Sequence, residues 1–205
     1  MSLLDSVARQ ARSLLGGDTS PDSPEARERR LVARIAAGEQ RALEDLYRAY
    51  HPRLQRFLGR MTHQPGLVDE ALNDTFLVVW HRADSYNGLS KVSTWIFGIA
   101  YRKGLKALQR FDEPQADDAQ DTRTEPGDGP EQQLASSQLQ RDLQRALAEL
   151  SPEHRAVVDL TYFHGLGYRE IADIADCPVG TVKTRMFYAR RRLRALLPGG
   201  KEDWL

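Results

Sequence analysis

Residues 168–196 read YREIADIADCPVGTVKTRMFYARRRLRAL, and this stretch decides the fold class. A short apolar-periodic segment, 168–175, is followed by a turn over 176–180 that contains Pro178 and Gly180. A long periodic segment begins near Thr181. A short helix, a tight glycine-containing turn and a basic second helix are typical of a helix-turn-helix unit.

The long second helix separates apolar from basic residues. One face carries Val182, Met186, Ala189, Leu193 and Leu196 or Leu197. All six charged residues between Lys183 and Arg194 are basic. An α-helix fits the DNA major groove, and flanking lysines and arginines neutralise phosphates. The alternative, a merely solvated basic surface, is disfavoured by the paired short helix, the turn and the absence of acids.

Helical signals continue on the N-terminal side of this unit. Ser151 and Pro152 are expected to start a helix, with serine as the N-cap and proline at the first helical position. Its inward residues are expected to include Leu160 and Phe163, and the glycines of 165–167 should end it. Leucines with helical spacing reach back to Leu134.

Residues 25–111 are also helical in pattern, and sustained period-two alternation is absent from the chain. Apolar residues recur at spacings of three and four up to Tyr50 and again from Leu54 to Met61, where the turn 63–66 follows. Further helices are expected over about 68–80 and 93–110, separated by a polar loop. The predicted fold class is therefore all-α.

The charges divide the chain into parts, although the net charge is zero. Residues 25–111 hold 15 Lys/Arg against 9 Asp/Glu, residues 112–135 have a balance of about −7, and residues 136–197 return to +3. We expect an N-terminal arm (1–24), a helical module (25–111), a flexible acidic linker (112–133), a helix-turn-helix module (134–197) and a tail (198–205). Two basic modules joined by an acidic tether indicate polyanion binding.

Several classes of protein are disfavoured. No apolar run approaches the roughly 20 residues that cross a bilayer, and Arg9 and Arg12 interrupt any signal peptide. The single cysteine, Cys177, excludes an internal disulfide and a cysteine-based zinc site, so a cytoplasmic protein is expected. Packing is favoured over redox sensing for its thiol. The five histidines lack metal-binding spacing, so neither a metal, a cofactor nor an enzymatic activity is predicted.

The chain resembles the extracytoplasmic-function (ECF) sigma factors of the sigma-70 family. Residues 150–185, with the segments Tyr168-Arg169-Glu170-Ile171-Ala172 and Cys177-Pro178-Val179-Gly180-Thr181-Val182-Lys183-Thr184-Arg185, resemble region 4. Residues 69–80 (DEALNDTFLVVW) and 93–102 (STWIFGIAYR) resemble region 2. The resemblance implies two helical domains, region 2 and region 4, in a non-enzymatic RNA polymerase subunit.

The resemblance implies that region 4 reads the upstream (minus-35) promoter element as duplex. Base-facing candidates are Thr184, Phe187 and Tyr188. Candidates for phosphate contacts are Lys183, Arg185 and Arg190, with Arg169 and Thr181. Many relatives carry a basic residue where Tyr188 stands, and tyrosine offers a ring and one hydroxyl in place of a guanidinium.

For region 2, the resemblance implies binding and opening of the downstream (minus-10) element. The loop 85–91 is the candidate pocket for a base removed from the stack, with Tyr86, Asn87, Ser90 and Lys91. Arg102, Lys103 and Lys106 would follow the backbone of the single strand, and Arg110 continues the stripe. Trp95 is expected in the core.

The resemblance also implies contacts with core RNA polymerase, at the beta-prime clamp and the beta flap. The clamp-binding residues would be Asp69, Glu70, Asn73 and Asp74, of which Asn73 stands where relatives often have an acid. An anti-sigma factor is a further expected partner, and a small-molecule substrate is not expected. Two alternatives remain: a helix-turn-helix regulator with a ligand-sensing N-terminal domain, and a protein-binding adaptor with a degenerate helix-turn-helix. The small basic first module and the retained arginines disfavour them.

Overall fold

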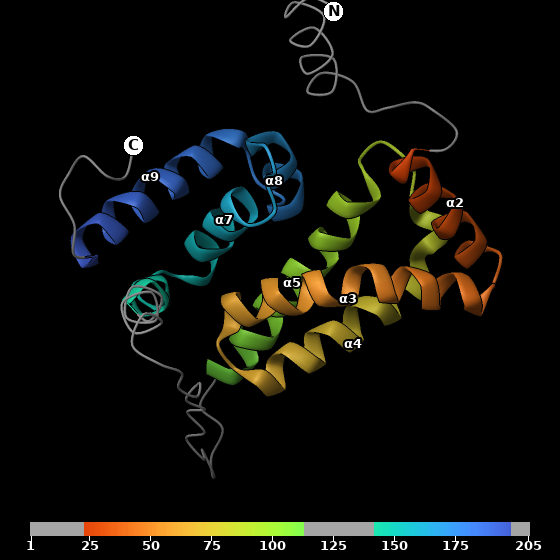
Figure 1. Ribbon diagram of the computed structural model, residues 1–205, viewed down its shortest axis with the longest axis horizontal. Coiled ribbons are helices and arrows are strands. Elements are labelled where there is room, and N and C mark those ends of the chain that lie inside the picture. The colour runs from red at the N-terminus through yellow and green to blue at the C-terminus, as the bar shows by residue number, and fades with distance from the viewer. Residues whose placement is uncertain (1–22, 113–141, 198–205) are drawn as a thin grey trace, which may run out of the picture.

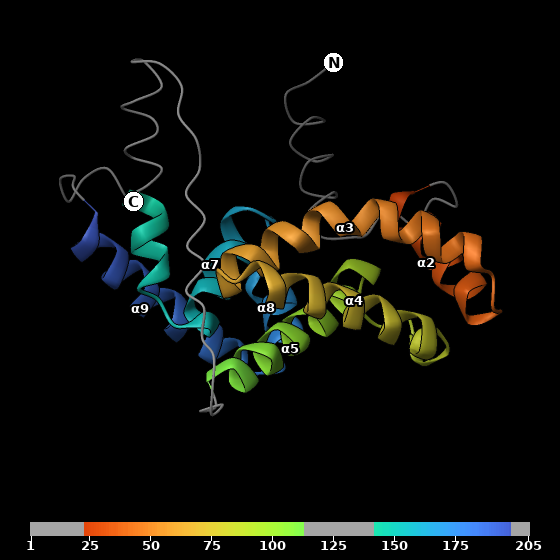
Figure 2. The same cartoon turned by 90° about the horizontal axis from the view of Figure 1, so that it is seen from below.

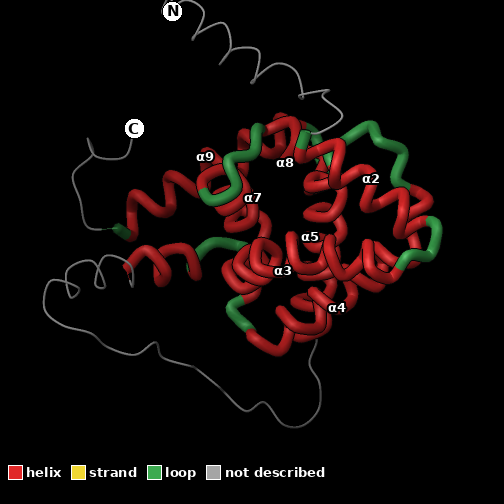
Figure 3. The backbone as a smooth tube through the Cα atoms, turned by 45° about the vertical axis from the view of Figure 1, so that its right-hand side comes forward, coloured by secondary structure: helices red, strands yellow, loops and turns green. Residues whose placement is uncertain are grey.

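A computed structural model describes residues 23–112 and 142–197, and within these ranges the chain forms helices and turns without any β-strand (Figures 1 and 3). The predicted all-α class is confirmed. The predicted arm, most of the acidic linker and the tail lie outside the described residues. The elements, in order, are α2 (Pro24–Ala36), α3 (Gln40–Thr62), α4 (Pro65–Arg82), the 3-10 turn η1 (Ala83–Ser85), α5 (Val92–Asp112), α7 (Pro152–Tyr162), α8 (Tyr168–Ala175) and α9 (Val179–Leu196).

Helices α2 to α5 form the first module, whose core contains fully buried Tyr50, Phe57 and Phe97. The apolar residues up to Tyr50 and those from Leu54 to Met61 lie on one helix. Helix α3 runs through Pro52, and the break between α2 and α3 lies at Gly38, which has a φ of +85°. Glycine adopts this left-handed conformation without steric cost, so the chain turns there.

The second module contains a helical segment at residues 142–148 and helices α7, α8 and α9. Ser151 caps α7 as predicted, because its side chain accepts a hydrogen bond from the His154 N–H. Asp176, with a φ of +49°, ends α8 and makes the turn, and α9 begins at Val179, two residues before the predicted start. Phe163 was expected to point inward, but it is exposed because α7 has already ended at Tyr162.

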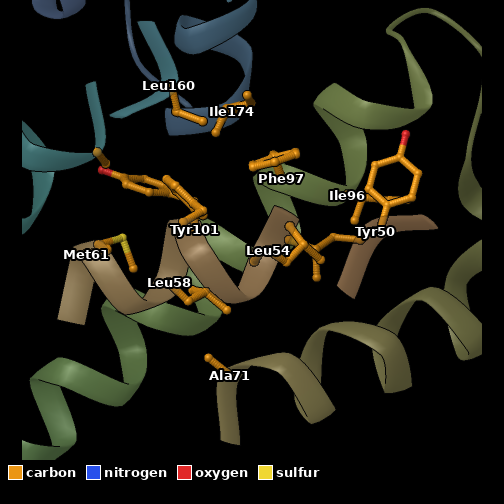
Figure 4. Packing of buried hydrophobic residues seen from close by; sticks show 14 of the residues in the cluster. Tyr50, Leu54, Leu58, Met61, Ala71, Ile96, Phe97, Tyr101, Leu160 and Ile174 are labelled. Carbon is orange, nitrogen blue, oxygen red and sulfur yellow. The ribbon is translucent and has the colours of Figure 1, made fainter. Parts of the chain in front are cut away.

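The two modules pack directly against each other. Helix α5 contacts α8, and α3 contacts α7, so the buried residues of both modules form one hydrophobic cluster (Figure 2). Figure 4 shows Leu160 and Ile174 of the second module facing Phe97 and Tyr101 of α5. The described residues therefore form two modules that share one hydrophobic interface.

Two classes of feature are absent from the described part of the chain. Across residues 23–112 and 142–197, none of the helices is both long enough and apolar enough to span a lipid bilayer. The same ranges hold no group of three His, Cys, Asp or Glu side chains placed to share a metal ion.

Candidate nucleic-acid and polymerase interface

Helix α9 presents an aromatic and basic surface outside its buried face. Val182, Met186 and Ala189 are buried as predicted. Phe187 is 62% exposed and Tyr188 is 52% exposed, and their rings lie edge to face with centroids 5.5 Å apart. The predicted DNA-contacting residues that are exposed in region 4 are Arg169, Lys183, Thr184, Phe187, Tyr188 and Arg190.

Arg185 and Thr181 differ from that exposed group, because both are only half-exposed. The Arg185 guanidinium lies 3.9 Å from the Cys177 sulfur. It also neighbours the Tyr101 hydroxyl of α5: burial raises the pKa of Tyr101, and the charge and hydrogen bond of Arg185 oppose that rise. Arg185 therefore faces the first module.

Tyr162 holds Arg190, and the sequence patterns did not indicate this contact. The Arg190 Nε–H donates to the Tyr162 hydroxyl over 3.1 Å, and the guanidinium carbon lies 5.8 Å from the centre of the tyrosine ring. This bond uses one edge of the guanidinium, so its two terminal nitrogens remain available to a phosphate.

The loop that follows η1 is ordered by its own side chains. The Tyr86 hydroxyl donates to the Ser90 carbonyl over 2.6 Å, and the Asn87 Oδ1 accepts from the Leu89 N–H over 3.0 Å. The Tyr86 ring also lies 5.3 Å from that of Trp95, which packs against the core. Tyr86 is thus half-buried and anchored, whereas Leu89, which was not among the predicted site residues, is 89% exposed at the tip.

The predicted basic stripe of α5 lies next to the predicted acidic face of α4. Arg102 and Lys106 are exposed. Lys103 pairs with Asp74 over 2.9 Å. In the same way, the Arg110 side chain pairs with Glu70. Two of the four predicted clamp-binding residues are therefore neutralised by α5.

The free face of α4 includes three exposed residues at a spacing of four. Asp69 and Asn73 are exposed, and Leu77 is 55% exposed on the same face. Leu77 was not among the predicted site residues, because only polar residues of this segment were selected as clamp contacts. Its presence adds an apolar side chain to this surface beside polar neighbours.

Charged side chains join the two modules. The Lys91 Nζ of the loop lies 2.8 Å from Oε1 of Glu170 in α8, while Oε2 of Glu170 accepts from the Gly167 N–H over 3.1 Å. Burial raises the pKa of Glu170, but these two hydrogen bonds outweigh it and the pKa lies below its usual value. The pKa of Lys91 is raised, mainly by its hydrogen bond to Glu170.

Buried charges lie deeper in the same interface. The Asp159 Oδ1 accepts from the Arg60 Nε–H of α3. Oδ2 lies 3.2 Å from His164 Nε2, although the two atoms are not aligned for a hydrogen bond. Arg155 donates to carbonyls of both modules, and burial lowers its pKa.

Comparison with known proteins agrees with this geometry. The chain matches the family model "Sigma-70 region 2" over residues 46–114 and the model "Sigma-70, region 4" over residues 140–193. The ECF RNA polymerase sigma-E factor of Haemophilus influenzae is 30% identical over 173 residues, which cover 80% of this chain and 91% of that protein. RNA polymerase sigma factor YlaC of Bacillus subtilis is also 30% identical, with coverage of 79% and 95%.

Solved structures with the same fold include CnrH in complex with the cytosolic domain of CnrY, with a TM-score of 0.61 and 26% identity over 83% of this chain and 96% of that one. The sigma factor RpoE of Bartonella quintana, in complex with the anti-sigma factor NepR, has a TM-score of 0.57 and 23% identity over 78% and 97%. Matches to regions 2 and 4, in this order, also rule against the two alternatives of a ligand-sensing regulator and an adaptor. The chain belongs to the sigma-70 family, among its extracytoplasmic-function sigma factors, and is a transcription initiation factor, not an enzyme.

Proposed function

We propose that this sigma factor acts in the cytoplasm, with region 2 on the minus-10 element and region 4 on the minus-35 element. The main support is the exposed surface of α9. There Phe187 and Tyr188 lie among lysine and arginine side chains, on a helix whose other face is buried. This proposal includes the boundaries of both modules and the residue roles that follow. Purified protein added to core polymerase with a genomic promoter library should give specific transcripts. Failure to form holoenzyme or to start specific transcripts contradicts it.

The basic residues of α9 contact the DNA backbone in this proposal. Lys183→Ala should weaken binding of the upstream duplex for every sequence and lower the slope of log affinity against log salt by about one. Fluorescence anisotropy over a salt series measures both quantities. Arg27→Ala, which removes an exposed arginine on α2, is the matched control and should leave the slope unchanged. An unchanged slope for Lys183→Ala would exclude a contact between Lys183 and a DNA phosphate.

The exposed aromatic pair reads bases in this proposal. Tyr188→Ala should change the preference among upstream elements, because it removes a ring and a hydroxyl that can reach base edges. Selection of binding sites from a randomised upstream element compares the variant with the wild type. The same preference in both would show that Tyr188 does not read bases.

Region 2 holds the single strand after the duplex opens. The exposed Arg102 and Lys106 can follow its backbone, and the ordered tip of the loop, with Asn87 beside Leu89, faces the unpaired base. Tyr86 supports this loop, since its hydroxyl and ring are both engaged. Lys103 takes part only when its pair with Asp74 opens.

Core polymerase binds the free face of α4 in this proposal, with Asp69, Asn73 and Leu77 at the beta-prime clamp. Glu70 and Asp74 contribute through their pairs with α5. Region 4 contacts the beta flap. An anti-sigma partner is proposed as a family expectation.

A further inference from the structure

A groove runs between the second half of α9 and the residues that lead into α7, where Figures 1 and 2 show α9 beside the segment 142–148. It has a volume of about 480 Å³, opens to solvent and is mostly apolar. This volume lies within the range of ligand pockets in proteins, so the groove has room for a large aromatic side chain. Its walls are formed by Tyr188, Arg191, Arg192 and Ala195 on α9 and by Leu150 and His154 opposite.

We propose that this groove binds the chain's own tail, residues 198–205, with the Trp204 ring inside it, and that the bound tail competes with the upstream DNA duplex. The tail lies outside the described residues, and it follows α9 directly along the chain. The docking itself is independent of the proposed function, whereas the competition with DNA rests on it.

The tail is long enough to reach every part of the groove. Leu197, after the last turn of α9, has an extended backbone with φ −89° and ψ 133°. Trp204 follows Leu197 by seven residues, which span at most about 24 Å. Tyr188, the wall residue farthest along α9, precedes Leu197 by nine residues, or about 13 Å of helix axis. Gly199 and Gly200 supply the backbone freedom that a reversal along α9 requires.

A tryptophan side chain suits the chemistry of the groove. Its ring buries about 150–250 Å² against apolar atoms, and its Nε1–H still needs an acceptor. Leu150 and Ala195 line the groove with apolar atoms. The Glu149 carboxylate, which pairs with Arg192 over 3.1 Å, has lone pairs left for the indole N–H. Because Trp204 is the one aromatic residue of the tail, it is the side chain that the groove selects.

The charges of the tail complement those of the groove. The α9 wall is basic at Arg191 and Arg192, and the two residues before Trp204 are the acids Glu202 and Asp203. Within the part of the chain that the structure describes, Arg191 has no carboxylate partner. A docked ring brings both tail carboxylates beside these arginines. Exposed ion pairs add little stability, so the charges orient the tail and the ring supplies most of the affinity.

A docked tail changes what α9 presents to DNA. Tyr188, a proposed base-reading residue, forms one wall of the groove, and 52% of its surface is exposed. An indole packed beside this ring covers part of it. The two tail carboxylates also stand next to the proposed phosphate contacts of the same helix, where they repel DNA phosphates. The tail and the upstream duplex therefore exclude each other at this surface.

One exposed alanine allows the groove to be blocked without changing the core. Ala195→Glu adds a carboxylate that fills part of the groove and repels the acids of the tail. Ala49→Glu makes the same change at an exposed alanine of α3, outside the groove, and is the matched control. The double variant Glu202→Lys with Asp203→Lys tests the contact from the tail, and it decides the test if Ala195→Glu loses helical circular dichroism.

Fluorine NMR of the full chain labelled with 5-fluorotryptophan follows the indole directly. The Trp204 signal is the one that Trp204→Phe removes, and a peptide of residues 198–205 gives its undocked position. We expect the wild-type signal to differ from that of the peptide at any protein concentration, because the docking is intramolecular. The signal should move most of the way to the peptide position in Ala195→Glu and in the tail double variant, and it should stay at the wild-type position in Ala49→Glu.

Three results overturn the docking. The first is a wild-type Trp204 signal at the position of the peptide signal. The second is a shift that grows with protein concentration, because the groove then receives the tail of a second copy. The third is weaker binding of core polymerase by Ala195→Glu with an unchanged Trp204 signal, which would assign the groove to polymerase.

The competition is measured as the affinity for an upstream duplex. Trp204→Ala should bind it about tenfold more tightly than the wild type if only a tenth of the wild-type tails are released. Phe111, which is 56% exposed in α5, provides the control: Phe111→Ala also removes an exposed ring and should bind as the wild type does. Equal affinity of Trp204→Ala and the wild type overturns the competition alone. If the wild type and all variants bind neither core polymerase nor duplex, the proposed function fails, whereas the fluorine signal still decides the docking.

Discussion

Replacement of Arg155 by Met should lower the free energy of unfolding by about 3–5 kcal/mol, because several main-chain carbonyls lose the charged donor that satisfies them. The side chain donates to five main-chain carbonyls: those of Arg60, Met61, Leu147, Ala148 and Leu150. Methionine keeps most of the apolar stem but donates nothing. Each carbonyl left buried without a partner costs about 1–3 kcal/mol.

All five of these hydrogen bonds from Arg155 go to carbonyls, and none of the five goes to a carboxylate. Burial lowers its pKa, which means that the protein disfavours the charged form by desolvation and compensates with carbonyl contacts. Arginine is suited to this position because it offers five donors in a planar fork, whereas lysine has three on one nitrogen. Arg155→Lys should therefore fall between the wild type and Arg155→Met.

Urea denaturation followed by circular dichroism measures the effect. Arg191→Met, on the exposed side of α9, is the matched control and should stay within about 0.5 kcal/mol of the wild type. A loss below about 1 kcal/mol for Arg155→Met would show that the carbonyls find water or other donors instead.

Local periodicity was sufficient to predict most of the helices and the buried side of α9. The spacing of Val182, Met186 and Ala189 depends only on the helical repeat, and all three are buried as expected. The turn between α2 and α3 was not predicted, because Gly38 gives no stronger local signal than other glycines, although its φ of +85° marks the turn in the structure.

Contacts between distant parts of the chain could not be predicted in this way. Arg60 and Asp159 are 99 positions apart, and the hydrogen bond from Arg155 to Met61 spans 94 positions. Helical phase shows which residues share one helix face, but it does not show which face of another helix will oppose them. For the same reason the pairing of Lys103 with Asp74 was not anticipated, although both had been selected as site residues.

Exposed apolar residues were a second limit. Leu77 and Leu89 are 55% and 89% exposed, and neither was selected as a site residue, because only polar and aromatic side chains were chosen in these two segments. Only the packed structure shows that the inner face of α4 is already complete without Leu77. The free face of α4 is defined by the packed structure, because there residues of α5 pair with Glu70 and Asp74 and leave the neighbouring face open.

Leu77→Glu should weaken the binding of core polymerase by about 30-fold or more, corresponding to the 2 kcal/mol or more that a central interface residue contributes. In the proposed complex this side chain, one helical turn beyond Asn73, is buried against core polymerase. A glutamate there must lose its hydration without a guaranteed partner, which adds to the loss of apolar contact. Because Leu77 is exposed in the free chain, the free energy of unfolding of the Leu77→Glu variant should remain within about 0.5 kcal/mol of the wild-type value.

Titration of labelled chain with core polymerase measures this affinity, and Leu89→Glu is the matched control. It makes the same change at an exposed leucine of the same module, but in the minus-10 loop. We expect Leu89→Glu to bind core normally and to impair promoter opening, because a carboxylate at the loop tip would face an unpaired base and its phosphates. Equal core affinity for Leu77→Glu and the wild type would place the clamp contact elsewhere than the free face of α4. A core-binding defect in Leu89→Glu would show instead that the minus-10 loop also docks on polymerase.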